Sequence, residues 1–334
     1  MAELVPIPGV MLERLAALGV DVDRILERAG IPRALLVPPR GRVSTAEFFG
    51  LWRSIEELVP ARDLGLRLGA EALPYKYDVA SMAALHAPTV GAALEKLARY
   101  KRLVCPEEVS VSVAEREARV GFHWWLAEGE PPRLLVDGTF ASILALLRRG
   151  TGRDLTPVRV ELARRRMDVA LLARHFGCEI RFDAPVDRMV LPEAALAEPF
   201  VTHNADLLAL LLPGLDAELA EEGRRRSLAD EVRLVLCRRM CGERPSVDKV
   251  ARDMRTSPRT LQRRLGEAGT SYQRLLDEVR SQSARRLLAR TDLDAGEVAF
   301  LLGFEEQNSF ARAFQGWEGM TPARYRTLAG AAPR

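Results

Sequence analysis

The last hundred residues constrain the fold of this chain most strongly, because turns and cap residues divide them into short helical segments. Caps such as Ser257 and Asp294 each precede a run with apolar residues at helical spacing, which predicts a helix start. The pattern predicts seven helices after residue 227, so this part is expected to be all-α. Two segments, 246–268 and 299–326, share one rhythm of a short helix, a tight turn and a second helix. That rhythm is typical of a helix-turn-helix, which is therefore predicted twice.

In both predicted units, the apolar residues fall on one face and leave a polar set on the other. The inner face of the first unit comprises Val250, Ala251, Met254, Leu261 and Leu265. The inner face of the second unit comprises Val298, Ala299, Leu302, Phe304, Phe310 and Phe314. The outward residues on the two second helices, called the reading positions below, are Arg259, Gln262, Arg263, Gln307, Asn308 and Arg312. Arginine and glutamine suit base edges, because their paired donors and acceptors match guanine and adenine in the major groove.

A connecting helix from Ser271 to Leu288 is predicted between the two units. At ~1.5 Å per residue this helix would be about 27 Å long. That length suits a strut between two recognition helices about one DNA turn, ~34 Å, apart. A helical bundle with a charged outer surface explains the same periodicity without DNA, and periodicity alone leaves both interpretations open.

Charge is distributed unevenly along the chain. Residues 223–334 hold 22 Lys and Arg against 14 Asp and Glu, a net charge of +8. Residues 1–222 hold 27 against 32, a net charge of −5. This asymmetry is typical of a nucleic-acid-binding domain joined to a domain of another kind, although a solvated basic surface is also common.

The first 222 residues predict an α+β domain with a small, mostly antiparallel sheet. Residues 1–72 have helical periodicity, with Ser44 and Glu47 as the predicted cap of a helix at 46–58. Further helices are predicted up to Leu103 and at 134–149. The alternating runs that predict strands are 109–113, 120–124, 157–163, 179–182 and 189–191. A polar turn at Glu115–Glu117 predicts that the first two runs form a hairpin. Two short helices, 207–212 and 215–222, then lead to a polar, basic run at 221–227 that we interpret as the linker. The expected domains are therefore 1–222 and 223–334.

Several classes of protein are disfavoured by the sequence. No run of ~18 apolar residues predicts a membrane span, and the N-terminus lacks the pattern of a secretory signal, so we expect a cytoplasmic protein. The four histidines are scattered without ligand spacing or a nucleophile motif, so we expect no metal, no cofactor and no enzyme activity. The four cysteines, Cys105, Cys178, Cys237 and Cys241, are expected to be free buried thiols, with a redox sensor as the alternative.

Residues 228–326 resemble the DNA-binding domain of the AraC/XylS family of bacterial transcription regulators. The second unit carries the clearest match, in Leu302-Gly303-Phe304, Ser309-Phe310-Ala-Arg312-Ala-Phe314 and Gly319-Met-Thr321-Pro322 with Tyr325-Arg326. In the first unit the match is Ser257 with Arg259-Thr-Leu261-Gln-Arg263-Arg264-Leu265. The resemblance implies an activator that binds promoter DNA, contacts RNA polymerase and forms a homodimer. It also implies that helices at about 258–267 and 307–316 enter successive major grooves through the six reading positions.

Glu305 and Glu306 depart from the pattern of that family, because adjacent carboxylates repel phosphate. We expect these carboxylates to act at the helix N-terminus, or one of them to accept from cytosine N4.

The N-terminal part resembles the arabinose-binding-type sensor domain of one branch of the same family. The resemblance rests on Ala87-Pro-Thr-Val-Gly91 with the helix that follows, on His175-Phe-Gly-Cys178 and on Phe182-Asp-Ala-Pro-Val186. About five short strands do not make the jelly roll of a cupin, and the label does not imply that arabinose binds. The candidate effector-binding residues are Tyr75, Tyr77, His86, Tyr100, Arg102 and Trp124. The alternative for each is an ordinary packed or surface side chain.

We therefore expect a sequence-specific transcription regulator whose sensor domain responds to a small molecule or a partner. The alternative is an architectural or anti-regulatory DNA-binding protein that acts mainly through protein contacts. An enzyme with a DNA-targeting module is the third hypothesis, and the missing catalytic constellation argues against it.

Overall fold

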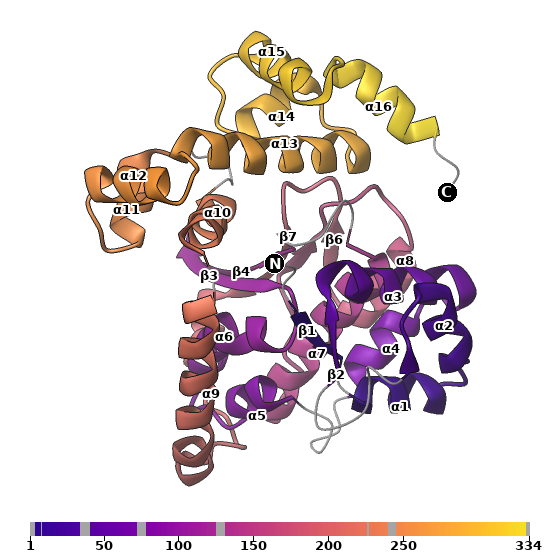
Figure 1. Cartoon of the computed structure of the whole chain (residues 1–334). Helices are drawn as coiled ribbons and strands as arrows, with labels where there is room; N and C mark the ends of the chain where they lie inside the picture. The colour runs from indigo at the N-terminus through magenta and orange to yellow at the C-terminus, as the bar shows by residue number, and fades with distance from the viewer. Residues whose placement is uncertain are drawn as a thin grey trace. The chain divides into compact units, whose positions relative to one another are not determined.

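The computed structural model describes residues 4–7, 9–33, 41–71, 78–124, 131–225, 227–239 and 245–331. The chain forms two compact units, which are described in turn (Figure 1). The first unit comprises Met1–Val160, Met167–Ile180 and Arg188–Glu222. The second unit comprises Gly223–Arg334 together with Glu161–Arg166 and Arg181–Asp187, which come from earlier in the chain. None of the helices in the described parts is long and apolar enough to cross a membrane.

The N-terminal part has the predicted α+β architecture. Its helices are α1 (Gly9–Ala17), α2 (Val22–Ala29), α3 (Thr45–Leu58), α4 (Leu64–Ala70), α5 (Val79–Leu85), α6 (Val90–Tyr100), η3 (Lys101–Leu103), α7 (Arg133–Thr151), α8 (Val169–Phe176), η4 (Glu193–Ala197) and α9 (Ala205–Arg225). Five strands make one sheet in the order β3-β4-β7-β5-β6. They are β3 (Glu108–Ala114), β4 (Glu117–His123), β5 (Arg159–Glu161), β6 (Glu179–Arg181) and β7 (Asp187–Pro192).

The β3–β4 hairpin matches the prediction closely. The two strands are antiparallel, and Ala114 pairs with Glu117 at the closed end. Glu115 and Arg116 form the two-residue turn with φ of 55° and 61°. Positive φ at both central residues is what a tight hairpin turn requires, because it matches the right-handed twist of the strands.

The prediction that residues 1–72 form only helices is wrong in one respect. Leu4–Ile7 (β1) pairs antiparallel with Gly41–Ser44 (β2) in a second, two-stranded sheet. Each strand has four residues, which is too short for alternation to be distinguished from helical spacing. The predicted cap of the next helix is confirmed, since Ser44 and Glu47 form a complete capping box at the start of α3.

Helices α4 and α7 cross very closely in the core of the first unit. Both carry glycines at the crossing, and a Cβ placed on Gly69 would lie 2.3 Å from the carbonyl oxygen of Gly138. A Cβ on Gly65 would lie 2.3 Å from the carbonyl oxygen of Leu134. Only residues without a side chain permit this approach, so the glycines determine how deeply α7 is buried.

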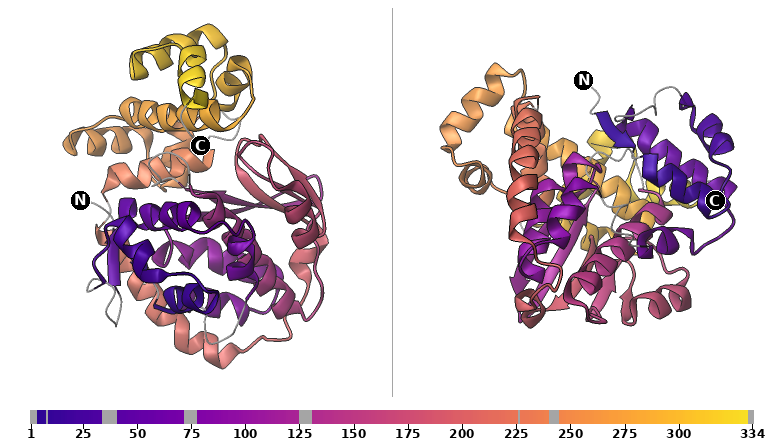
Figure 2. Two further views of the ribbon diagram at one scale, coloured as in Figure 1. Left: turned by 90° about the vertical axis from the view of Figure 1, so that its right-hand side faces the viewer. Right: turned by 90° about the horizontal axis from the view of Figure 1, so that it is seen from below.

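Helix α9 corrects two sequence predictions. It is one helix across Pro213, where two helices were predicted, and it continues to Arg225 through most of the predicted linker. A proline removes one helical hydrogen bond, and the surrounding apolar contacts keep the helix continuous. The helix runs without a break in the ribbon (Figure 2). Leu208 and Leu215 belong to one cluster of buried residues with Tyr100 at the end of α6. Glutamate and arginine are good helix formers, so their presence in the run at 221–227 also favours helix over linker.

The second unit contains the seven helices that were predicted for the C-terminal part. They are α10 (Leu228–Arg239), α11 (Val247–Asp253), α12 (Pro258–Glu267), α13 (Tyr272–Arg290), α14 (Ala295–Leu301), α15 (Gln307–Glu318) and α16 (Pro322–Ala331). One apolar core connects them, and it includes the residues predicted for the inner faces of the two helix-turn-helix units, except that Met254 and Phe304 are partly buried against it. Helix α12 lies where α13 begins, and α14, α15 and α16 pack along α13 (Figure 1).

Candidate nucleic-acid interface

The first helix-turn-helix consists of α11 and α12. The Ser246 hydroxyl accepts from the backbone N–H of Lys249 at 3.3 Å, and Ser257 caps α12 with Pro258 in the first turn. Serine caps and a proline at the helix start satisfy or remove backbone donors that would otherwise lack a partner. The turn between the helices places Arg255 in the left-handed region at φ 53°.

The second helix-turn-helix, α14 and α15, repeats this construction. Asp294 and Glu297 form the predicted capping box at the start of α14. At the turn, the Phe304 N–H donates to the carbonyl oxygen of Ala299 at 2.9 Å, as the Thr256 N–H does to Ala251 in the first unit. Both hydrogen bonds span five residues around one left-handed residue. The two turns therefore share one backbone geometry, although the first has Arg255 where the second has a glycine.

An aromatic cluster packs α15 against the turn before it and against α16. Phe310 and Phe314 are fully buried, with ring centroids 5.7 Å apart. Phe304 from the turn lies 5.7 Å from Phe310, and Tyr325 from α16 lies 5.4 Å from Phe314. The remaining member is Trp317, at 6.3 Å from Phe304. Such rings fix the rotation of α15, because edge-to-face and tilted packing constrain their orientation.

All six reading positions are exposed on α12 and α15. Three lie on each second helix, on the side opposite the residues that enter the core. Arg263 forms an ion pair with Glu267 one turn later on α12. This pair is exposed on both sides, so it costs little to break when another acceptor for the guanidinium is available. Glu306 occupies the N-cap position of α15 without a side-chain cap bond, and both carboxylates of the departing pair are exposed.

The connecting helix α13 is close in length to the helix predicted between the two helix-turn-helix units. Its 19 residues give a length of about 28 Å. Its apolar face, which includes Leu275, Val279 and Leu288, is buried in the core shared by both helix-turn-helix units. Ser281 on α13 donates to a carboxylate oxygen of Glu318 near the end of α15 at 2.8 Å. Helix α15 is therefore attached to α13 by polar as well as apolar contacts.

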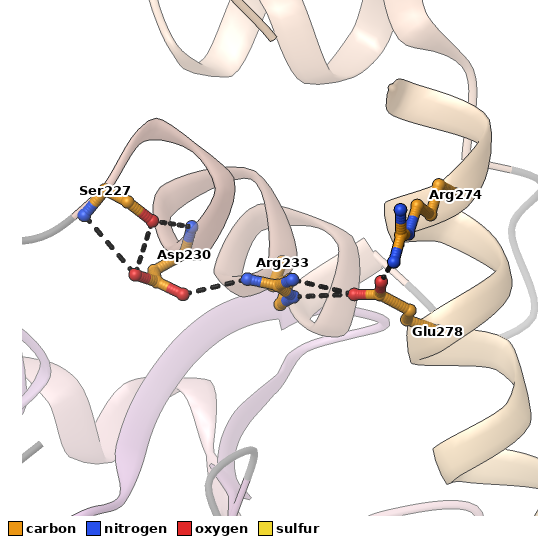
Figure 3. Close-up of polar contacts among 5 residues, drawn as sticks. All are labelled: Ser227, Asp230, Arg233, Arg274 and Glu278. Atoms are coloured by element: carbon orange, nitrogen blue, oxygen red, sulfur yellow. Dashed lines mark hydrogen bonds and ion pairs between the residues drawn. The ribbon is translucent and has the colours of Figure 1, made fainter. Parts of the chain in front are cut away.

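A chain of polar contacts attaches α10 to the same strut (Figure 3). Ser227 and Asp230 cap each other at the start of α10, and the second carboxylate oxygen of Asp230 accepts from Arg233 at 2.9 Å. Arg233 also donates twice to one carboxylate oxygen of Glu278 on α13, at 3.0 and 2.7 Å. Arg274 lies 3.4 Å from the other oxygen of Glu278. These contacts orient α10 relative to α13.

The effector candidates have packing or polar contacts on different elements of the first unit. His86 Nδ1 lies 2.6 Å from the carbonyl oxygen of Thr202, and Trp124 is buried with its ring 6.4 Å from Phe49 on α3. Tyr100 and Arg102 both face α9, where their partners are Asp216 and Glu222. The last two candidates, Tyr75 and Tyr77, lie outside the described residues. A role of these six residues in effector binding stays a prediction.

The first unit also buries a group of charged residues around η3. The Lys101 ammonium lies 3.6 Å from Asp78 and 3.8 Å from Glu107, and Glu107 accepts from the Thr139 hydroxyl at 3.2 Å. Burial raises the pKa of the Glu107 carboxyl, and burial also raises the pKa of the nearby Cys105 thiol. A thiol with a raised pKa is a poor nucleophile, which disfavours the redox alternative for Cys105.

Metal ligands do not gather in the parts of the chain that the structure describes. No group of three or more His, Cys, Asp or Glu residues there has metal-binding geometry. Cys105, Cys178 and Cys237 are partly exposed, which corrects the expectation of buried thiols, and Cys241 lies outside the described residues.

The sequence analysis did not identify Arg280, whose side chain extends from α13 to the turn of the second helix-turn-helix. Its side chain is 8% exposed and donates to the carbonyl oxygens of Leu302 and Gly303. A signal was present in the sequence, because Arg280 stands at helical spacing between the apolar residues Leu276 and Ala284. A charged residue within a buried stripe indicates a specific polar partner.

Comparisons with known proteins agree over both parts of the chain. Residues 19–200 match the family model of the arabinose-binding domain of AraC transcription regulators, located at their N-termini, and residues 250–327 match a helix-turn-helix domain model. The chain is 29% identical over 335 residues to the ornithine utilization regulator of Pseudomonas aeruginosa, with 97% of both chains covered. It is 25% identical over 322 residues to the regulator VirS of Mycobacterium tuberculosis, covering 95% of this chain and 94% of VirS. The crystal structure of the regulator CdpR from P. aeruginosa matches with a TM-score of 0.46 and 25% identity, over 95% of this chain and 96% of CdpR.

The fold, the two helix-turn-helix units and these relatives define a DNA-binding transcription regulator with an N-terminal sensor domain. The similar proteins are regulators and not enzymes. The first family model alone covers more than half of the chain. The chain belongs to the AraC family.

Proposed function

We propose that α12 and α15 are the two recognition helices and enter successive major grooves on one face of promoter DNA. The observation that carries this proposal is the repeated helix-turn-helix, which presents Arg259, Gln262 and Arg263 from one helix. Helix α15 presents Gln307, Asn308 and Arg312, and the 19-residue α13 separates the two helix-turn-helix units. Paired donors and acceptors on exposed helix faces suit direct reading of base edges.

In this proposal, residues 223–334 bind DNA, and residues 1–222 sense a small molecule and form a homodimer. The protein acts in the cytoplasm as an activator that contacts RNA polymerase. A relative over nearly the whole chain is an ornithine utilization regulator, which supports an amino acid or a related metabolite as the effector. Thermal unfolding of the full chain with and without single amino acids, ornithine included, tests the effector. Stabilisation by a ligand raises the unfolding temperature by mass action.

The DNA-reading proposal predicts which arginines determine sequence. A random duplex library is enriched with the full chain, and affinities for the enriched duplex are measured for Arg263→Ala and Arg312→Ala. Each variant is expected to lose about 1–3 kcal/mol of binding free energy, roughly 5- to 150-fold in affinity, and to relax sequence preference at its own base pair. Arg53→Ala removes an exposed arginine from α3 and is the matched control, expected to leave affinity unchanged.

Two outcomes would contradict this assignment. Unchanged affinity and sequence preference in both variants would show that the wrong residues were assigned. Failure of the wild-type chain to enrich any sequence would support the architectural alternative, because a protein that recognises only the backbone has no preference among duplexes.

A further inference from the structure

Arg280 contacts the turn of the second helix-turn-helix at three points. Its Nε donates to the Leu302 carbonyl oxygen at 3.0 Å, and one terminal nitrogen donates to the Gly303 carbonyl oxygen at 3.0 Å. The guanidinium carbon also lies 4.3 Å from the ring centroid of Phe304. Leu302, Gly303 and Phe304 are the first three of the five residues, 302–306, that connect α14 to α15. One buried side chain from the strut therefore contacts the first three residues of this turn.

The contact suits arginine because of the shape and charge of the guanidinium. A planar fork with fixed donor directions sets both a distance and an angle, whereas a lysine ammonium makes a point contact. The accepting carbonyl oxygens lie at the C-terminal end of α14, where backbone acceptors lack helical partners and a positive charge is favourable. The stacked Phe304 ring restricts the remaining rotation of the guanidinium plane.

The same helix contacts α15 again near its other end. Ser281, next to Arg280 in the chain, donates to Glu318, and the Arg285 Nε lies 3.7 Å from the same carboxylate. Helix α15 is thus held by α13 at the turn before its first residue and at its last residue, Glu318. By contrast, α12 leads into α13 through a short connection, between Glu267 and Tyr272. The angle between α12 and α15 therefore depends on how α13 holds the second helix-turn-helix.

We infer that Arg280 is a positioning residue, which sets the angle of α15 relative to α12 so that both helices reach their grooves together. The inference rests on the proposed function of these two helices. Arg280 itself is buried away from the reading positions and acts through the turn. Loss of the Arg280 side chain lets α15 reorient. The three reading positions on α15 then no longer align with their base pairs, whereas the three on α12 do.

The test compares base discrimination in the two halves of one DNA site. The probe is the duplex that the wild-type chain enriches from a random library. Each half of this site is called a block below, and the second block contains the base pairs at which Arg312→Ala abolishes sequence preference. Wild type is expected to lose about tenfold in affinity for each substituted base pair in either block. In Arg280→Met, the loss per substituted base pair in the second block is expected to fall to less than about twofold, with the first block unchanged. Arg280→Lys, which keeps the charge without the fork, is expected to fall between wild type and Arg280→Met.

Arg274→Met is the matched control, because Arg274 is an exposed arginine on the same helix with an ion pair to Glu278. It is expected to keep the discrimination of both blocks. Undiminished discrimination in the second block of Arg280→Met, or equal loss from both blocks, would overturn the inference and leave the proposed function intact. If Arg280→Met does not fold, Arg280→Lys decides by the same comparison of blocks. If the wild-type chain enriches no sequence, the proposed function fails, and the inference that rests on it fails too.

Discussion

The hydroxyl of Tyr100 shows how one residue can attach α9 to the helices before it. It donates to a carboxylate oxygen of Asp216 at 2.7 Å, and Arg99 donates to the same oxygen at 2.8 Å. Burial, with the hydrogen bond to Asp216, raises the pKa of Tyr100 to about 12. The same hydrogen bond from Tyr100, with that from Arg99, lowers the pKa of Asp216. Both shifts mean that folding favours the protonated phenol and the ionised carboxylate together.

Tyr100→Phe removes this hydrogen bond and is expected to lower the free energy of unfolding by about 1 kcal/mol near neutral pH. A lowered carboxyl pKa contributes stability above the ordinary value of 3.8, which is lost as pH falls through the folded value. A raised phenol pKa contributes stability below the ordinary value of 10.0, which is lost as pH rises towards about 12. The difference between wild type and variant is therefore expected to shrink at both extremes. Urea unfolding at several pH values measures it.

Tyr272→Phe is the matched control for this experiment. Its hydroxyl oxygen is buried and has no hydrogen-bond partner among the described residues, so its removal is expected to be neutral or slightly stabilising. A Tyr100→Phe effect that does not exceed the effect of Tyr272→Phe, or that does not change with pH, would contradict the role given to the Asp216 hydrogen bond.

At the scale of elements, sequence patterns predicted those structures whose signals are local. The capping boxes at Ser44 and Asp294, the polar hairpin turn and the phenylalanines of α15 all appeared where short-range rules placed them. The four-residue strands β1 and β2 were missed, because their stability depends on partners 34 to 40 residues away, from the Ile7–Gly41 pair to the Leu4–Ser44 pair. The continuity of α9 across Pro213 depends on tertiary packing too, which overrides local propensity.

The crossing of α4 and α7 gives a prediction in which one substitution has opposite effects at two sites. Gly69→Ala places a methyl group 2.3 Å from a backbone carbonyl oxygen, so the helices must separate, and a loss of about 1–3 kcal/mol of stability is expected. Gly50→Ala, inside α3, meets no atom of the other described residues within 4 Å beyond its chain neighbours and its own helix backbone, and is expected to stabilise by up to about 1 kcal/mol through helix propensity. Thermal unfolding of both variants checks the contrast. Equal effects of the two substitutions would contradict the close crossing.

At the scale of the whole molecule, the sequence predicted the class of the DNA-binding part. It did not predict the contact that orients α15 relative to α12. Exposed arginine, glutamine and asparagine on α12 and α15 follow from periodicity, since each helix buries the opposite face. The positioning contact of Arg280 did not follow, because residues 280 and 303 meet only when α13 and the second turn are packed together. The effector candidates were chosen by residue type. Residue type does not predict whether side chains far apart in the sequence, such as Tyr100 and Trp124, share one site.

The division of charge between the two parts of the chain leads to a prediction about salt. Residues 223–334 carry +8 and residues 1–222 carry −5, so attraction to phosphate is concentrated in the part that contains α12 and α15. A protein with about 6–10 phosphate contacts loses roughly 10³- to 10⁵-fold in affinity between about 50 and 200 mM salt, because binding releases counterions. The full chain is expected to show a steep linear dependence of this kind on its enriched duplex, measured by fluorescence anisotropy across a salt series.

Arg312→Ala separates base reading from phosphate attraction within the same measurement. If Arg312 contacts a base edge, its loss lowers affinity at every salt concentration and leaves the slope of log affinity against log salt unchanged. If it contacts a phosphate, the slope falls by about one and a random duplex is affected equally. We expect the first result, because Arg312 lies on the exposed face of α15, opposite the buried Phe310 and Phe314. A salt-independent affinity of the wild-type chain would contradict the role of the basic part altogether, since no DNA-binding surface of net charge +8 can avoid releasing counterions.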